Sequence, residues 1–181
     1  MSIAQKKSRS SLALLLGSLI TLVLLILTTS VQAHIEADMP DPIAEVEYQM
    51  MLDFEPDDMV TRYKLAMVYF RLNKLAKAEA ELQQVLKSKP NYFHGLEGLA
   101  ILRIKQQDYP AAIQALEKAL TSDLVESGTY YYLGRARQGL GDLKGATEAF
   151  SQGRTICAKE DEAKRAFTPG QFDDALTALK K

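Results

Sequence analysis

The sequence predicts an all-α protein built from repeated pairs of helices, and three observations lead to this prediction. Three short apolar dipeptides recur at one constant interval along the chain: Leu65-Ala66, Leu99-Ala100 and Leu133-Gly134. An alanine follows each leucine at the same distance: Ala78, Ala112 and Ala146. Glycine, proline and polar residues divide each interval into two stretches of helical length, and no strand pattern is visible. A constant internal period of about 20 to 50 residues is typical of repeat architectures.

The third interval shows the pattern best, with Tyr130, Leu133, Gly134, the Gly141-Asp142 turn, Ala146 and Phe150. This order of residues resembles the tetratricopeptide repeat (TPR). The resemblance covers three units: 59–92 as TPR 1, 93–126 as TPR 2 and 127–160 as TPR 3. It implies antiparallel helix pairs stacked into a right-handed α-solenoid of about three TPR pairs, with partial helices at both ends. The small residues at fixed positions would let neighbouring helices approach closely.

The first element along the chain is an apolar N-terminal segment. Lys6, Lys7 and Arg9 precede an uncharged stretch. Within it, residues 12–31 are long enough to span a bilayer, because a transmembrane helix needs about 20 residues. Two interpretations remain open for residues 1–33: a secretory signal peptide released after Ala33, or a single transmembrane anchor formed by residues 12–31. Both place residues 34–181 on the periplasmic or lumenal side, because bases precede the segment and acids follow it.

Residues 34–58 are predicted to be a linker and an N-terminal cap helix, because the stretch between Pro42 and Pro56 carries apolar residues at the offsets of a lone second helix. Within the repeats, Asp108 and Asp142 are predicted as N-caps, and Pro110 fits a first helical turn. Apolar residues at the later repeat positions are expected to fill the space between pairs: Leu82, Leu116 and Phe150.

Residues 161–181 are predicted to form a C-terminal capping helix or a partial repeat. The stretch from Gly170 to Lys181 resembles a second helix, with Ala175 and Leu179 at helical spacing. The highly charged segment before it is too short to supply the matching first helix at the repeat interval. A complete fourth repeat is therefore not expected.

Charge and composition exclude several function classes. Removing Lys6, Lys7 and Arg9 from the 22 bases leaves 19 against 23 acids, so residues 34–181 carry about −4, which argues against nucleic acid binding. The single cysteine, Cys157, permits neither an intramolecular disulfide nor a cysteine-based metal site. With two histidines and no phosphate-binding loop or nucleophile motif, the sequence predicts no metal, no cofactor and no enzymatic activity.

The TPR resemblance implies that a partner binds on the concave face lined by the first helix of each pair. The residues at the corresponding positions are the candidate groove residues: Tyr63, Met67, Phe70, Arg71, Glu97, Ile101, Ile104, Lys105, Tyr131 and Arg135. Large apolar side chains with scattered bases would suit an extended or helical peptide with apolar anchors and an acidic group. The alternative is that the chain's own terminal helices cover Met67, Phe70, Ile101 and Ile104.

Two functions follow as expectations. The first is a non-catalytic protein–protein interaction scaffold on the trans side of a membrane, an assembly or accessory factor that holds a partner segment in the groove. The second is a self-associating structural repeat protein, in which solenoid ends stack or the groove captures a neighbour's tail. The expected partners are a protein or peptide, a second copy of the chain, and the membrane if residues 12–31 are retained.

Overall fold

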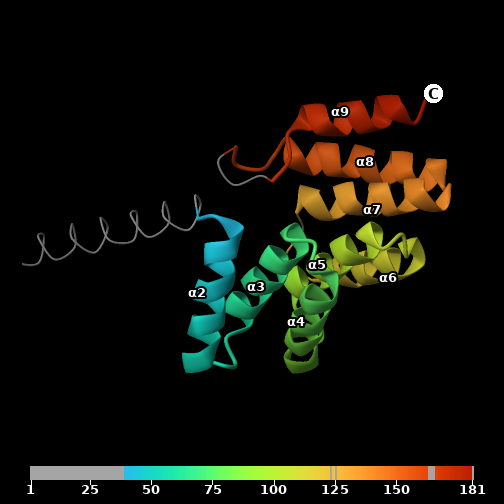
Figure 1. Ribbon diagram of the computed structural model, residues 1–181. Helices are drawn as coiled ribbons and strands as arrows, with labels where there is room; N and C mark the ends of the chain where they lie inside the picture. The colour runs from blue at the N-terminus through green and yellow to red at the C-terminus, as the bar shows by residue number, and fades with distance from the viewer. Residues whose placement is uncertain (1–38, 123, 125, 163–165, 181) are drawn as a thin grey trace, which may run out of the picture. The chain divides into compact units, whose positions relative to one another are not determined.

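A computed structural model describes residues 39–122, 124, 126–162 and 166–180 (Figure 1). The chain divides into two units, Met1–Ile43 and Ala44–Lys181. All regular secondary structure in the described residues is helical, which confirms the all-α prediction. The expected signal peptide or anchor in residues 1–33 lies outside the described residues. Among the described residues, none of the helices combines the length and apolarity that crossing a membrane requires.

The described helices form three consecutive pairs with a single helix at each end. The pairs are α3 (Met59–Arg71) with α4 (Leu75–Ser88), α5 (Phe93–Lys105) with α6 (Tyr109–Ala119), and α7 (Ser127–Leu140) with α8 (Leu143–Cys157); the single helices are α2 (Asp41–Phe54) and α9 (Pro169–Ala178). Each helix contacts its partner in the pair, and the second helix of one pair contacts the first helix of the next. The first helices α3, α5 and α7 also contact one another in sequence. Contact between neighbouring pairs alone is the arrangement of a solenoid.

The backbone conformation of the turn inside each pair recurs at the same interval as the sequence pattern. Asn73, Gln107 and Gly141 have positive φ angles of 58°, 62° and 86°. The N–H of the residue after each of them donates to a carbonyl of the preceding helix, as Asp142 N does to Arg137 O at 2.9 Å. This bond ends a helix with a left-handed residue, a conformation that costs glycine least. The close antiparallel pairing of the helices therefore begins with the same turn geometry in all three pairs.

Aspartate side chains cap the N-termini of three helices. The side chains of Asp108 and Asp142 accept from the backbone N–H groups of Ala111 at 3.3 Å and Gly145 at 2.9 Å, which confirms both predicted caps. Asp58 caps α3 in the same way, accepting from Val60 N at 2.9 Å. Each cap satisfies a backbone donor that the first helical turn leaves without a partner.

The residues at fixed repeat positions form the core. Ala78, Ala112 and Ala146 are completely buried, and so are the larger residues Leu116 and Phe150. A Cβ atom at Gly134 would lie 2.5 Å from the ring of Phe150, so only glycine allows α7 to approach α8 this closely. Leu65 and Leu133 are buried, but the equivalent Leu99 is only half-buried. The period therefore predicts burial well, with one exception in the middle pair.

Overpacking the middle pair tests this register. Ala112→Leu is expected to lower the free energy of unfolding by about 1–3 kcal/mol, because Ala112 is 0% exposed and a larger side chain there would overpack the core. The free energy is measured by urea denaturation followed by circular dichroism. Ala80→Leu is the matched control on the exposed surface of α4 and should stay within about 0.5 kcal/mol of the original protein. Equal midpoints for the two variants would contradict the repeat register.

The end helices are held by specific side chains. Ala44 and Tyr48 of α2 are buried, and Gln49 Nε2 donates to the hydroxyl of Tyr69 on α3 at 2.7 Å. At the other end, Phe172 of α9 is fully buried, and a Cβ at Gly153 of α8 would lie 2.5 Å from its ring. The segment expected to resemble a second helix instead contacts α8, as α5 contacts α4 and α7 contacts α6. By this contact α9 occupies the position that the first helix of a further pair would have.

Candidate binding face

The surface of α3, α5 and α7 that carries the candidate groove residues is called the first-helix face below. One closely packed part of it lies between α3 and α5. A Cβ at Gly98 would lie 3.1 Å from Tyr63 Cε2 and 3.5 Å from Met67 Sδ, so glycine lets these two large side chains of α3 lie over α5. The rings of Tyr63 and His94 lie 5.6 Å apart between centroids. Tyr63 and Met67 remain half-buried, which leaves part of each side chain accessible to a partner.

Glu97 lies in the middle of this face and is 8% exposed. Its Oε1 accepts a hydrogen bond from Thr129 Oγ1 of α7 at 2.9 Å. Burial raises the pKa of Glu97 to about 7, with the negative charge of Glu126 acting in the same direction and the Thr129 hydrogen bond opposing both. The carboxyl group is therefore poised between its neutral and charged forms near neutral pH.

Two tyrosines share this environment from the flanking helices. Burial raises the pKa of Tyr63 on α3 well above its usual value, and the nearby charge of Glu97 adds to the effect. Burial and the same charge raise the pKa of Tyr132 on α7. Both hydroxyl groups therefore stay neutral near neutral pH.

The first turn of α7, which supplies Thr129, is fixed by a carboxylate from beyond α8. Glu160 accepts hydrogen bonds from Ser127 N and from Ser127 Oγ, each at 2.7 Å. A carboxylate at a helix N-terminus satisfies a free backbone N–H and interacts favourably with the helix dipole. This contact holds Gly128 and Thr129 against α5, and a Cβ at Gly128 would lie 3.7 Å from Glu97 Oε1.

Tyr131 on α7 has a different environment from the one that the sequence suggested. Its ring stacks on Phe167, with 4.3 Å between centroids, and also meets the rings of Phe150 and Phe172. The backbone O of Phe167 accepts from Cys157 Sγ at 3.0 Å, which ties this segment to α8. The chain's own C-terminal segment thus covers the face at Tyr131, and no periodic signal in the sequence points to Phe167.

The remaining candidate residues are distributed over the rest of the first-helix face. Phe70, Ile101 and Ile104 are half-buried, whereas Arg71 and Lys105 are exposed in the last turns of α3 and α5. Arg135 is exposed and lines a hollow of about 360 Å³ shared with Gln138 and with Gln171 and Asp174 of α9. Apolar side chains therefore occupy the middle of the face on α3 and α5, and Arg71 and Lys105 lie at the C-terminal ends of these two helices.

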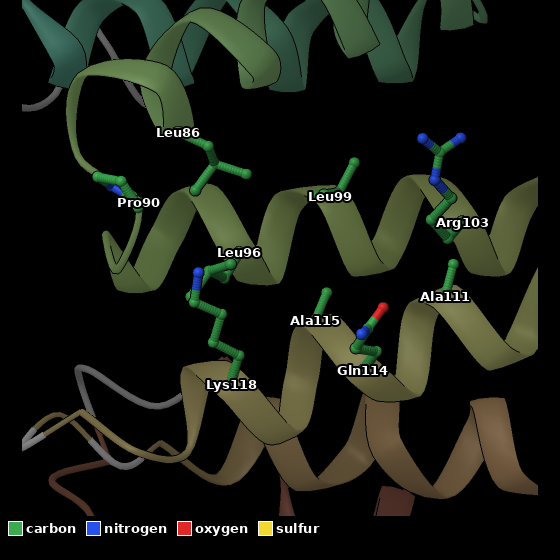
Figure 2. Close-up of a pocket in the computed structure, with 9 residues that line it drawn as sticks. All are labelled: Leu86, Pro90, Leu96, Leu99, Arg103, Ala111, Gln114, Ala115 and Lys118. Carbon is green, nitrogen blue, oxygen red and sulfur yellow. The ribbon is translucent and has the colours of Figure 1, made fainter.

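A second hollow, of about 440 Å³, lies between α4, α5 and α6 and contains none of the candidate groove residues. Figure 2 shows Leu86 and Pro90 at one end of it, Arg103 at the other, and Leu99 between them. Arg103 is already paired with Glu79 at 2.6 Å. The half-burial of Leu99 is explained by this hollow. Neither hollow contains a metal site, and the described residues bring no three metal-ligating side chains together.

Comparisons with known proteins agree with this architecture. A family model described as tetratricopeptide repeat matches residues 63–125, from within α3 to beyond α6. No curated protein matches the chain. The three solved structures described next have low sequence identity to the chain, at 22%, 20% and 19%, so their likeness concerns the fold.

Three solved proteins illustrate the likeness. PcrH in complex with the chaperone binding region of PopD has a TM-score of 0.62 at 22% identity, covering 69% of this chain and 92% of that chain. A fragment of MamA from Desulfovibrio magneticus RS-1 has a TM-score of 0.62 at 19% identity, covering 85% and 88%. The second TPR domain of human RPAP3, in complex with an HSP70 peptide, has a TM-score of 0.56 at 20% identity, covering 67% and 94%. Together with the family model, these structures support the TPR resemblance.

Proposed function

We propose that this chain is a non-catalytic protein–protein interaction scaffold on the trans side of a membrane, an assembly or accessory factor that holds a partner segment on the first-helix face. TPR proteins generally act as non-catalytic interaction modules. The observation that carries the proposal is the contact of Tyr63 and Met67 with Gly98, which packs two large side chains on α5 and leaves both half-buried. Partly accessible aromatic and methionine side chains are typical anchors of a protein interface.

Two of the similar structures support the choice of a peptide partner. PcrH was solved with a region of PopD, and the RPAP3 domain with an HSP70 peptide. A solenoid offers such a partner a surface continuous over several helices, on which an extended or helical segment places successive side chains. We assign the same kind of partner to this chain, with Tyr63, Met67, Phe70 and Ile101 as its apolar contacts.

The trans location rests on the N-terminal sequence. Three bases precede an uncharged segment of signal or anchor character, and acids follow it. The repeat domain is then either anchored by residues 12–31 or released after Ala33. N-terminal sequencing of the protein purified from its native cells distinguishes the two, since a chain that begins at His34 has been cleaved and one that retains residues 12–31 has not.

Removing the two α3 anchors is expected to abolish partner binding. The double variant Tyr63→Ala with Met67→Ala should weaken binding by about 2 kcal/mol or more, because central anchors of an interface contribute most of its affinity. The measurement is a crosslinked pull-down of the full-length tagged protein from detergent-solubilised membranes. Met50→Ala with Met51→Ala is the control, since both methionines are exposed on α2, at 56% and 42%.

The same pull-down separates the two functions. A defined partner that the Tyr63/Met67 variant loses and the Met50/Met51 variant keeps supports the scaffold. Retention of that partner by a correctly folded Tyr63/Met67 variant shows that the first-helix face does not bind it. Recovery of the chain alone, from the original protein and both variants, favours a self-associating repeat protein instead.

A further inference from the structure

Glu97 is distinctive among the charged residues that the structure describes. It is the one Asp, Glu, Lys, Arg or His side chain in these ranges that is buried in the repeat domain, at 8% exposure. Its hydrogen-bond donor among the described residues is Thr129, a neutral hydroxyl. Burying a carboxylate without a cation is unfavourable, and such groups in proteins are usually paired. Because Glu97 lies on the candidate binding face, a bound partner is in a position to supply the pairing cation.

The groups near Glu97 come from α3, α5 and α7, and several of them are aromatic. Tyr63 on α3 and Tyr132 on α7 lie within electrostatic reach of the carboxyl group, and His94 on α5 packs against Tyr63. Gly128 on α7 presents no side chain next to Glu97 Oε1, and the ring of Phe167 lies beyond it, 3.2 Å from a Cβ at that glycine. A carboxylate with tyrosine side chains on both flanking helices is suited to bind a cation, by charge and by cation–π attraction.

We propose that Glu97 binds a basic side chain, lysine or arginine, of the partner segment on the first-helix face. The inference rests on the proposed function, because it names the chemistry of the partner at that same face. The bound cation would lie between the aromatic rings of α3 and α7, while neighbouring apolar residues of the partner contact Met67 and Ile101.

The charges facing Glu97 favour a base over an acid in the partner. Among the described residues, the groups that interact electrostatically with Glu97 are Tyr63 from α3, Tyr132 from α7 and Glu126 before α7, and these are neutral or negative. The sequence alone suggested an acidic partner group, because of Arg71, Lys105 and Arg135. Those three side chains are exposed, where ion pairs are screened by water and contribute little. A buried carboxylate therefore discriminates more strongly between partner charges.

A purely structural role explains Glu97 less well. Its one described polar contact is as acceptor for Thr129, and a glutamine could accept the same bond without the cost of burying a charge. A cation at this position would stabilise the charged form and lower the pKa of Glu97 from about 7. Binding of a basic segment therefore releases a proton below pH about 7 and is weakened there, by up to about tenfold per pH unit.

The test is a selection from a displayed library of short random peptides on the full-length chain in detergent, at pH about 8, where Glu97 is charged. Glu97→Gln is selected in parallel with the exposed control Glu148→Gln and with the Tyr63/Met67 double variant. We expect the original protein and Glu148→Gln to enrich lysine or arginine at one fixed position beside apolar residues. Glu97→Gln should lose this enrichment and bind a selected basic peptide at least about thirtyfold more weakly.

Two further measurements separate binding from folding and from other titrating groups. Thermal unfolding of Glu97→Gln should occur at the same or a higher temperature than that of the original protein, so a lost preference does not come from a lost fold. Because His94 lies beside Tyr63 on the same face, the pH dependence of peptide binding is compared between the original protein and Glu97→Gln. The difference between the two pH profiles is the effect of the Glu97 carboxyl group.

The outcomes are distinguishable. Peptides that need Tyr63 and Met67 but show no enrichment of bases, or keep that enrichment in Glu97→Gln, overturn the inference and leave the proposed function standing. If no selected peptide depends on Tyr63 and Met67, the proposed function fails and the inference fails with it. Loss of the basic preference in Glu97→Gln alone supports both.

Discussion

Phe150→Ala is expected to lower the free energy of unfolding by about 3–5 kcal/mol, the range typical of removing a fully buried aromatic ring. Phe150 is 0% exposed and fills the space that Gly134 leaves open between α7 and α8. Its ring also meets that of Tyr131, 5.7 Å away between centroids, and lies in one core cluster with Cys157 and Phe172. Alanine would therefore leave a cavity at a point where three helices are joined.

The solenoid arrangement predicts which helices lose stability in Phe150→Ala. Because each pair contacts only its neighbours, the weakened α7–α8–α9 region should open at lower urea concentration than α3 to α6. Urea denaturation followed by circular dichroism gives the free energy, and amide hydrogen exchange shows which helices open first. Phe54→Ala is the matched control, since Phe54 is 83% exposed and its loss should change stability by less than about 0.5 kcal/mol. Similar losses for both variants would contradict the assignment of Phe150 to the core.

The features that could be predicted from the sequence are those whose physical requirement recurs in every helix pair. Close helix contact needs a small residue at the same place in each pair, so Ala78, Ala112 and Ala146 recur at the period and are all buried. The turns within pairs need a residue that tolerates positive φ, and these too recur at the same interval, at Asn73, Gln107 and Gly141. Each requirement acts within one pair, so the sequence displays it three times.

Other features depend on contacts that occur once. Phe167 reaches Tyr131 from a segment outside the repeat period, so no second copy reveals its position. The bond between Glu97 and Thr129 joins residues on different helices, and a glutamate on an amphipathic helix ordinarily faces water. Leu99 occupies a position that is buried in the other two pairs and yet lines a hollow. The candidate groove residues could thus be placed on helices from sequence, but not their degree of burial.

The burial of Glu97 makes stability depend on pH in a definite direction. Its pKa is about 7 in the folded protein, against 4.5 for an unperturbed glutamate. Between these values the folded state holds the proton more tightly than the unfolded state, so stability falls as pH rises from 4.5 to about 7. Above that range the charged group opposes folding by about 3 kcal/mol, and below 4.5 the penalty is absent.

Glu97→Gln should therefore stabilise the empty protein at pH about 8, by up to about 3 kcal/mol, and change little at pH about 4. The amide oxygen keeps the acceptor for Thr129 without a charge to bury. Urea denaturation at a series of pH values measures this, with the exposed Glu148→Gln as control. A variant less stable than the original protein at pH about 8 would mean that the charged carboxylate is already compensated within the chain. A stabilised variant would instead identify Glu97 as a residue retained at a cost to the fold, which is typical of residues kept for binding.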